Sequence, residues 1–446
     1  MRSAIKFGTD GWRAVIGDGY TMDNLERVSR ATAEWVLDTY GKDSTVVVGY
    51  DTRFRGVDFA KQSAVVMASM GLKVVVSEGF APTPAISWAT VEYGYQAGVV
   101  ITASHNPHHD NGIKFFGPDG FKLSDFDELK IEALFKKELP LVSSELIGRA
   151  SRITDGLGRY IEVVKTTLPS SFTLEGLKIV IDCANGASYK AAPEVLWELG
   201  AEVIELGNHP DGYNINLNCG SMYPDKATEV VLREKAHLGI CLDGDADRVI
   251  LIDEKGNKVN GDQFMALIAS FWQQIGRLRG NGIVATVMSN LGFERYLNEL
   301  NLHLKRTPVG DRYVLEEMRK SNYNLGGEQS GHIIMTDYMT TGDGLVAALQ
   351  FLAAMVDGGK PASELLKKFE LYPQIIKNVE YSGKVDFLEQ VSVKKIISES
   401  EKKLGSDGRL LIRKSGTEPL IRIMVEHSDT KLIEEIVQQI SSEMKI

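Results

Sequence analysis

A serine and a histidine stand next to each other at positions 104 and 105, directly after the apolar run Ala97–Ile101. The following Asn106-Pro107 is a turn signal that ends the run. Such a run predicts a buried strand, and ligands of α/β proteins bind beyond the carboxyl ends of strands. The hydroxyl of Ser104 could attack an acyl group or carry a phosphoryl group. A hydrolase is disfavoured because the segment lacks the Gly-x-Ser-x-Gly pattern of a nucleophile elbow.

Three aspartates alternate with small residues after a second apolar run, 238–242. Alternate side chains of an extended segment point the same way, so we expect Asp243, Asp245 and Asp247 to converge. Three hard oxygen ligands suit Mg²⁺. A solvated acidic turn, and an aspartyl-phosphate enzyme with Asp243 as its nucleophile, remain alternatives. An EF-hand loop is disfavoured because Arg248 stands where that loop requires a glycine.

Loop 326–332 combines glycines with hydrogen-bonding side chains, those of Glu328, Gln329, Ser330 and His332. Glutamate accepts hydrogen bonds from sugar hydroxyls, and serine and histidine can share protons with a hydroxyl or a phosphate. Taken alone, the loop is equally typical of a polar turn with a structural histidine.

Near the C-terminus, loop 413–419 combines an arginine with small polar residues. Arg413 offers a planar fork that matches phosphate geometry, and Arg422 follows shortly after. Ser415 and Thr417 add hydroxyl donors, and Gly416 lets backbone N–H groups face an anion. The loop therefore predicts a phosphate site, with a polar hairpin as the alternative.

Lys114 lies among apolar residues in segment 111–116. Burial lowers the pKa of a lysine toward the range used in acid–base catalysis, although most lysines extend their ammonium group to the surface. His105, His108 and His109 are too close in sequence for a tetrahedral zinc site. We expect His108 and His109 to face solvent.

These loops need strands and helices to bring them together, and the chain repeats one pattern of elements three times. Each copy has a strand, a loop, a helix and a second strand, which is a βαβ unit. The predicted strands of the three copies are 46–51, 72–76, 178–182, 201–206, 283–287 and 302–306. In the tail, the pattern predicts strands at 375–381, 409–413 and 421–426 and helices at 391–403 and 431–444.

The predicted fold class is therefore α/β, with three tandem α/β domains that have mixed sheets and a smaller C-terminal α+β domain. The predicted domains are 1–150 with the serine loop, 151–252 with the aspartate loop, 253–362 with loop 326–332, and 363–446 with loop 413–419.

The chain has 446 residues and a formal net charge of −10, without a block of lysine and arginine. This charge disfavours nucleic acid and anionic membranes as partners. No apolar run approaches the length of a membrane span, and the N-terminus lacks the apolar region of a signal peptide, so we expect a cytoplasmic protein. The three cysteines suggest neither a disulfide framework nor a zinc site.

Taken in order, the four loops resemble those of the α-D-phosphohexomutase superfamily, over essentially the whole chain. Segment 102–107 is similar to its phosphoserine loop, 243–248 to its metal loop, 327–332 to its sugar loop and 413–419 to its phosphate loop. The segments most similar to the phosphoglucosamine mutase branch are 110–116, 214–216, 219–221, 261–263, 309–313 and 327–332. Segments 11–14 and 101–104 are closer to the phosphoglucomutase/phosphomannomutase branch, and Lys414 stands where proline is usual.

The resemblance implies an isomerase that moves a phosphoryl group between the 6- and 1-oxygens of a hexose phosphate. Phosphorylated Ser104, bound to Mg²⁺ with Asp243, Asp245 and Asp247, would pass its phosphoryl group to the sugar through a bisphosphate intermediate. The resemblance also implies that Arg13 and Arg248 steady the transferring group and that Lys114, with help from His105, acts as acid and base. The residues implied to bind the sugar are Glu328, Ser330, His332, Gly310 and Asp311. Those implied to bind the second phosphate are Arg413, Ser415, Gly416, Thr417 and Arg422.

The expected substrate is glucosamine 6-phosphate, converted to glucosamine 1-phosphate for amino-sugar nucleotide and cell-wall precursor supply. Glucose or mannose phosphate is the alternative substrate. An aspartyl-phosphate phosphatase and a catalytically silent sugar-phosphate sensor are the alternative functions. The expected partner is a small hexose phosphate, a homodimer is compatible with the sequence, and we expect the tail domain to close over the substrate.

Overall fold

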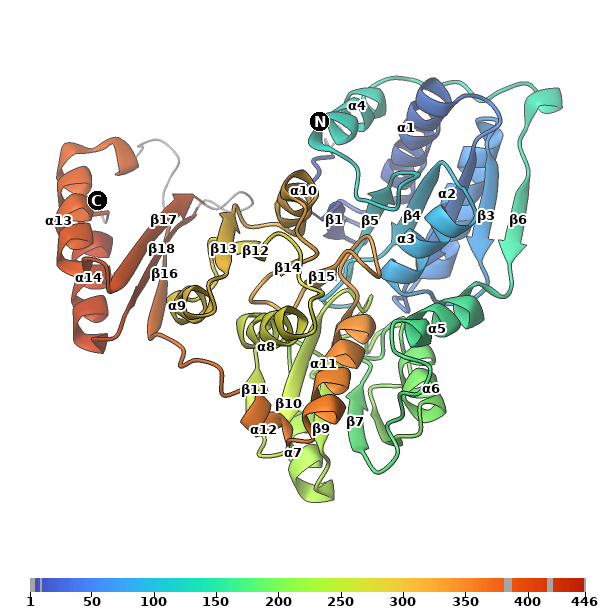
Figure 1. Ribbon diagram of the computed structural model, residues 1–446. Helices are drawn as coiled ribbons and strands as arrows, with labels where there is room; N and C mark the ends of the chain where they lie inside the picture. The colour runs from blue at the N-terminus through green and yellow to red at the C-terminus, as the bar shows by residue number, and fades with distance from the viewer. Residues whose placement is uncertain (1–4, 9, 381–386, 415–419, 445–446) are drawn as a thin grey trace.

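The computed structural model describes residues 5–8, 10–380, 387–414 and 420–444. Its strands form four sheets that follow one another along the chain, each with helices packed against it (Figure 1). No helix among the described residues combines the length and the apolarity that a membrane span requires.

The first sheet has the strand order β1-β5-β4-β2-β3-β6. Strands β2, β3, β4 and β6 are parallel, whereas β5 is antiparallel to both of its neighbours. Helices α1, α2 and α4 pack on one face and α3 on the other, which buries all of the central strand β4. The bounds are β1 Trp12–Val15, α1 Met22–Tyr40, β2 Thr45–Tyr50, α2 Gly56–Ser69, β3 Lys73–Ser77, α3 Thr83–Glu92, β4 Ala97–Ile101, β5 Asp110–Phe116, α4 Asp125–Phe135, a 3-10 turn Ser144–Leu146 and β6 Ala150–Ile153.

The second sheet has the order β11-β10-β9-β7-β8, with β10 antiparallel to β9 and β11. Apolar residues of α7 cover one face and those of α5 and α6 the other. The bounds are α5 Gly156–Thr166, β7 Lys178–Asp182, α6 Ala191–Glu198, β8 Glu202–Leu206, α7 Asp225–Glu234, β9 Leu238–Leu242, β10 Val249–Asp253 and β11 Lys258–Val259.

The third sheet has the order β13-β12-β14-β15, with only the β14–β15 pair antiparallel. Its helices α8 and α11 share one continuous apolar core with the second sheet, so these two sheets form a single packed unit. The bounds are α8 Gly261–Gln274, β12 Gly282–Thr286, α9 Leu291–Glu299, β13 His303–Thr307, α10 Asp311–Ser321, β14 Leu325–Gly327, β15 Ile333–Met335, α11 Gly344–Gly358 and α12 Ala362–Leu365.

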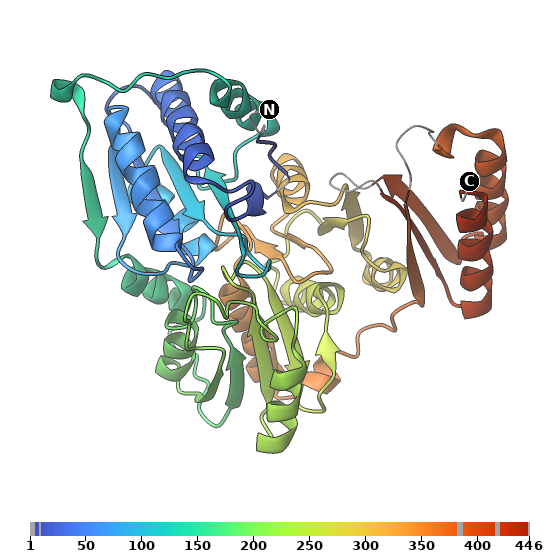
Figure 2. The ribbon, with the colours of Figure 1, turned by 180° about the vertical axis from the view of Figure 1, so that it is seen from behind.

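The fourth sheet is antiparallel, with the order β16-β18-β17, and has its own core against α13 and α14. Figure 2 shows this last part of the chain at one end of the molecule, next to α9 and β13 and away from the first sheet. The bounds are β16 Gln374–Glu380, a 3-10 turn Phe387–Glu389, α13 Val391–Leu404, β17 Gly408–Lys414, β18 Leu420–His427 and α14 Thr430–Glu443.

The predicted fold class is confirmed: three α/β domains with mixed sheets precede a smaller α+β domain. The first sheet extends to Ile153 and the second to Val259, a few residues past the predicted boundaries at 150 and 252. Each predicted site loop begins where a strand ends. β4 leads into the serine loop, β9 into the aspartate loop, β14 into loop 326–332 and β17 into loop 413–419.

Candidate active site

Ser104 lies just beyond β4 in a left-handed backbone conformation, with φ of +50°. Its side chain is fully buried, and its hydroxyl donates a hydrogen bond of 2.6 Å to Oδ2 of Asp243 at the end of β9. Left-handed backbone is disfavoured for any residue with a Cβ atom, so the surroundings must hold it in place. The contact joins the ends of two strands that belong to different sheets.

Asp243, Asp245 and Asp247 converge as predicted. All three are buried, and one carboxylate oxygen of each lies within 4.8 Å of the other two. The predicted reason, an extended segment, is wrong. The segment forms a tight turn in which Ala246 has φ of +61°. Gly244 permits the turn to approach the serine loop, because a Cβ there would lie 2.7 Å from the carbonyl oxygen of Ser104.

The three aspartates fit a divalent cation. Burial and the nearby carboxylates of Asp247 and Asp245 raise the pKa of Asp243 well above its usual range, so a bound cation would relieve the repulsion. Oδ1 of Asp245 and Oδ1 of Asp247 are buried and accept no hydrogen bond from the described part of the chain. Unpaired buried carboxylate oxygens are the ligands that Mg²⁺ prefers.

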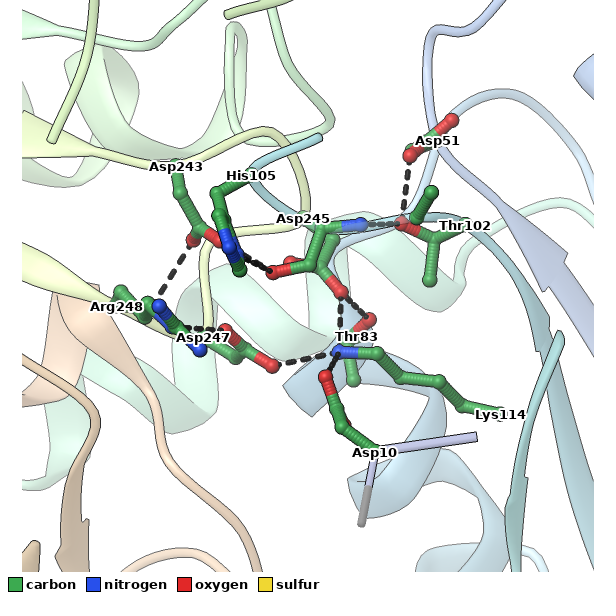
Figure 3. A network of polar contacts seen from close by, with 12 residues as sticks. Asp10, Asp51, Thr83, Thr102, His105, Lys114, Asp243, Asp245, Asp247 and Arg248 are labelled. Carbon is green, nitrogen blue, oxygen red and sulfur yellow. Dashed lines mark hydrogen bonds and ion pairs between the residues drawn. The ribbon is translucent and has the colours of Figure 1, made fainter. Parts of the chain in front are cut away.

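Lys114, on β5, points into the same cluster (Figure 3). Its Nζ lies 2.8 Å from Oδ2 of Asp245, 2.7 Å from Oδ2 of Asp247 and 3.1 Å from Oδ2 of Asp10. The expectation of a lowered pKa is wrong. Burial does lower it, but the three carboxylates outweigh burial and raise the pKa of Lys114 well above its usual value. The ammonium group is therefore charged and is the internal counterion of the acidic turn.

His105 is a neutral ring in this environment. Burial, followed by the positive charges of Arg248 and Arg13, lowers its pKa to about 3. Its Nδ1 lies 3.4 Å from Oγ of Ser104. His109 is more than half exposed, as predicted, whereas His108 is partly buried and packs edge-on against Tyr213.

Arg13 and Arg248 both lie close enough to the serine loop for their charges to act on His105. Arg13 donates 3.1 Å to Oδ1 of Asn106 and 3.3 Å to the carbonyl oxygen of Ala103, and it also pairs with Asp10. The Nε of Arg248 lies 3.9 Å from Oδ1 of Asp247 and has no hydrogen-bond partner in the described structure. Both guanidinium groups are placed where an anion on Ser104 would meet positive charge.

Loop 326–332 reaches the aspartate turn through His332. Its Nδ1 lies 3.6 Å from Oδ1 of Asp247, and its Nε2 lies 3.2 Å from Oδ2 of Asp311. Burial lowers the pKa of His332, but the two carboxylates outweigh it and raise the pKa above the usual value. Glu328 is half-buried and accepts hydrogen bonds from the backbone N–H of Gly310 and the hydroxyl of Ser330, which is exposed.

Arg413 and Arg422 line a separate cleft of about 930 Å³ between the first, third and fourth domains. Burial and the charge of Arg422 lower the pKa of Arg413, and an anion between the two groups would relieve that repulsion. Neither Ser104 nor the three aspartates line this cleft. The predicted residues Ser415, Gly416 and Thr417 lie outside the described residues.

Three further residues touch the site although no sequence pattern predicted a role for them: Asp10, Lys122 and Arg53. Lys122 pairs with both Asp10 and Asp311 and so links the first domain to the third. Arg53 binds the backbone of the serine loop. Arg53 could have been found, since Thr52-Arg53 directly follows the predicted strand 46–51. Lys122 has no comparable signal.

Four models of one protein family match the chain in succession. They are the phosphoglucomutase/phosphomannomutase alpha/beta/alpha domains I at residues 4–141, II at 158–256 and III at 260–372, and the C-terminal domain at 373–443. The chain belongs to the phosphoglucomutase/phosphomannomutase family.

Two curated members of this family show which branch the chain resembles. The phosphoglucosamine mutase of Cereibacter sphaeroides (strain ATCC 17025) is 54% identical over 440 residues, which covers 98% of each chain. That of Paracoccus denitrificans is 53% identical over 435 residues, which covers 97% of each chain. The resemblance inferred from the four loops is therefore confirmed for the superfamily and for the phosphoglucosamine mutase branch.

Two solved structures have the same fold. A phosphoglucomutase/phosphomannomutase family protein of Burkholderia thailandensis aligns with a TM-score of 0.81 at 22% identity, over 99% of this chain and 98% of that one. The N-acetylphosphoglucosamine mutase of Aspergillus fumigatus, in complex with GlcNAc-6P and magnesium, aligns with a TM-score of 0.67 at 17% identity, over 99% and 96%.

Proposed function

We propose that the protein is a phosphoglucosamine mutase, which interconverts glucosamine 6-phosphate and glucosamine 1-phosphate through a phosphoserine at position 104. The observation that carries the proposal is the hydroxyl of Ser104, held 2.6 Å from Asp243 in a buried acidic turn. The 54% identity to a phosphoglucosamine mutase supports the choice of sugar.

The proposed reaction moves one phosphoryl group in each direction. The bond between phosphorus and Oγ of Ser104 breaks, and a bond from phosphorus to a sugar oxygen forms. The sugar hydroxyl loses a proton and the serine oxygen gains one, so protons balance. We assign this exchange to Lys114 with help from His105: the charged ammonium group of Lys114 donates a proton to the serine oxygen and, once neutral, accepts the proton of the sugar hydroxyl. The bisphosphate then turns around, and the serine takes back the other phosphoryl group.

We propose Mg²⁺ as the cofactor, held by Asp243, Asp245, Asp247 and the phosphorylated Ser104. When bound, the ion neutralises negative charge on the transferring phosphoryl group. Arg13 and Arg248 add two positive charges to the same region from the protein itself. The magnesium in the Aspergillus fumigatus structure supports this choice of metal.

The sugar and its second phosphate are assigned to the third and fourth domains. Glu328, Ser330 and His332 would bind sugar hydroxyls, together with Gly310 and Asp311 at the start of α10. The described residues Arg413 and Arg422 would bind the non-reacting phosphate, along with Ser415, Gly416 and Thr417. We further propose that the protein acts in the cytoplasm and that homodimers form, which size-exclusion chromatography can test.

A coupled assay with three substrates tests the proposal. Glucosamine 6-phosphate, glucose 1-phosphate and mannose 1-phosphate are compared at equal concentration with Mg²⁺ and a catalytic amount of the matching bisphosphate. We expect the highest kcat/KM for the glucosamine phosphate. Turnover of glucose 1-phosphate without turnover of glucosamine 6-phosphate would contradict the choice of sugar.

Phosphopeptide mapping separates the proposed mechanism from its alternative. We expect an acid-stable label on Ser104, and no turnover in Ser104→Ala. A label on Asp243 with no phosphoserine would instead support an aspartyl-phosphate phosphatase. Sugar-phosphate binding without any turnover by the intact chain would support a sensor.

A further inference from the structure

The guanidinium group of Arg53 is buried under the serine loop, and each of its five N–H groups has an acceptor. One N–H donates to the carboxylate of Asp51, three donate to backbone carbonyl groups of the serine loop, and one donates to the backbone carbonyl group of Asp110 at the start of β5. The acceptors are Oδ2 of Asp51 at 2.9 Å and the carbonyl oxygens of Ser104 at 2.6 Å, Asn106 at 2.8 Å, Pro107 at 2.6 Å and Asp110 at 3.3 Å. A lysine could not make this set of contacts, since it carries only three donors on one atom.

The backbone N–H of Ser104 is tied to the same arginine through a second path. It donates 2.9 Å to Oγ1 of Thr102, whose hydroxyl donates 2.6 Å to Oδ2 of Asp51. Asp51 also balances the buried charge of Arg53. Both the N–H and the C=O of Ser104 are therefore fixed by the Asp51–Arg53 pair.

A second tie comes from the neighbouring domain. The amide of Asn216 donates 2.9 Å to the carbonyl oxygen of Ser104 and 3.0 Å to that of Asn106. Arg53 and Asn216 thus hold the same two carbonyl groups from the first and the second domain. Oδ2 of Asp243 also belongs to the second domain, so these contacts fix the serine relative to the acidic turn.

The contacts explain why Ser104 keeps a strained conformation. With φ of +50°, its backbone would relax to a negative φ if its carbonyl were released, and the hydroxyl would turn away from Asp243. We infer that Arg53 is a positioning residue for phosphoryl transfer, which holds the left-handed backbone that aims Oγ of Ser104 at the acidic turn. Asn216 completes the hold across the domain boundary. The inference rests on the proposed role of Ser104 as phosphoryl carrier.

The variant Arg53→Lys keeps the positive charge beside Asp51 and removes most of the carbonyl contacts. The measurement is the single-turnover rate at which phosphorylated enzyme transfers its phosphoryl group to glucosamine 6-phosphate. The rate is divided by the amount of phosphoserine, so that molecules that fail to fold and carry no phosphoserine are not counted. We expect this rate to fall by about 100-fold, since small misplacements of a reacting group have effects of that size. The KM for the sugar phosphate should stay within about threefold, since the hydrogen bonds of the Arg53 side chain go to Asp51, to the serine loop and to Asp110, and not to the residues assigned to the sugar.

The matched control is Arg55→Lys. Arg55 lies two residues further on, is exposed and pairs with Asp58, so the Arg55→Lys variant should transfer the phosphoryl group at the wild-type rate. The second variant is Asn216→Gly, which removes the amide and tolerates the left-handed backbone at that position, where φ is +57°. We expect a fall of about 10-fold in the same rate.

If Arg53→Lys transfers its phosphoryl group as fast per mole of phosphoserine as the wild type does, the inference is overturned. If Arg53→Lys does not fold, Asn216→Gly decides: a reduced rate at unchanged KM supports the inference, and an unchanged rate overturns it. A wild-type enzyme that carries no phosphoserine would instead overturn the proposed function itself, so the two failures are distinct.

Discussion

At the scale of single residues, the site is dominated by opposite charges that burial brings into contact. The three carboxylates around Lys114 raise its pKa. Burial alone would raise the pKa of Asp247, but the positive charges of Lys114 and His332 outweigh burial and lower it. Coulomb attraction at distances below 3 Å exceeds the cost of desolvation here. The acidic turn is thus partly neutralised by the protein alone.

We predict that Lys114→Met destabilises the fold, since it leaves buried carboxylates without their internal counterion. The free energy of unfolding should fall by about 3–5 kcal/mol, the usual cost of removing one partner of a buried ion pair. Denaturant unfolding in the presence of EDTA measures this. Added Mg²⁺ should restore part of the loss. The exposed Lys130→Met is the control, and equal stability of the two variants would contradict the role given to Lys114.

Removal of the metal gives the second prediction. Dialysis against EDTA should abolish turnover without unfolding the protein, and Mg²⁺ should restore it. Because Mg²⁺ binds the folded state and not the unfolded state, it should also raise the midpoint temperature of unfolding. The stabilisation of the folded state should be about 2.7 kcal/mol at a Mg²⁺ concentration 100 times the dissociation constant. Scanning calorimetry at several Mg²⁺ concentrations measures the shift. Asp245→Asn should show a much smaller one, and an equal shift in this variant would argue against the acidic turn as the site.

At the scale of elements, helix α4 of the first domain is joined to α10 of the third. Arg312 on α10 donates 2.6 Å to Glu128 on α4 and also pairs with Asp125. Burial raises the pKa of Glu128 to about 7, although Arg312 opposes this shift. These helices border the cleft that holds Arg413 and Arg422, so their pairing helps to set its width.

We predict that this pair makes stability depend on pH. The folded state binds the proton of Glu128 more tightly than the unfolded state, whose carboxyl has a pKa near 4.5. The resulting stabilisation is complete below that value and is lost as pH rises through about 7. Between pH 5.5 and 8, the wild type should lose about 2 kcal/mol relative to Glu128→Gln. Denaturant unfolding across this range measures the difference, and the exposed Glu138→Gln should show none.

At the scale of the whole molecule, the fourth domain is attached through a small polar joint. Asn290, which caps α9, donates to the carbonyl oxygen of Tyr372 and accepts from its N–H. Arg409 donates 2.9 Å to the carbonyl oxygen of Ser289 and pairs with the buried Glu426. The fourth domain has its own separate core, so rotation at this joint leaves that core intact.

We predict that the fourth domain closes when a hexose phosphate binds. Arg413 and Arg422 line an open cleft, and a phosphate held between them would draw the domain toward the third. Small-angle scattering should show a smaller radius of gyration with glucosamine 6-phosphate than without it. Arg413→Met should weaken this change. No compaction of the wild type at saturating substrate would contradict the prediction.

Local sequence patterns predicted the strands that lead into the serine loop, the aspartate loop and loop 413–419, because apolar runs and βαβ order are local, whereas the short strand β14 before loop 326–332 was not predicted. Ser104, the three aspartates and the family resemblance were all found in this way. The alternation argument for the aspartates nevertheless gave the right result for the wrong reason, since a tight turn at Ala246 replaces the extended segment.

Which charged side chains come into contact depends on the tertiary fold. Lys114 and Asp247 are 133 positions apart, and Lys122 and Asp311 are 189 apart, so no local pattern shows either pair. The sign of the Lys114 pKa shift, the neutral state of His105 and the support of Ser104 by Arg53 all depend on such contacts. Local sequence patterns indicate the strand or loop from which a side chain projects. The pKa of that side chain, and the retention of a strained backbone, depend on the residues that the fold packs around it.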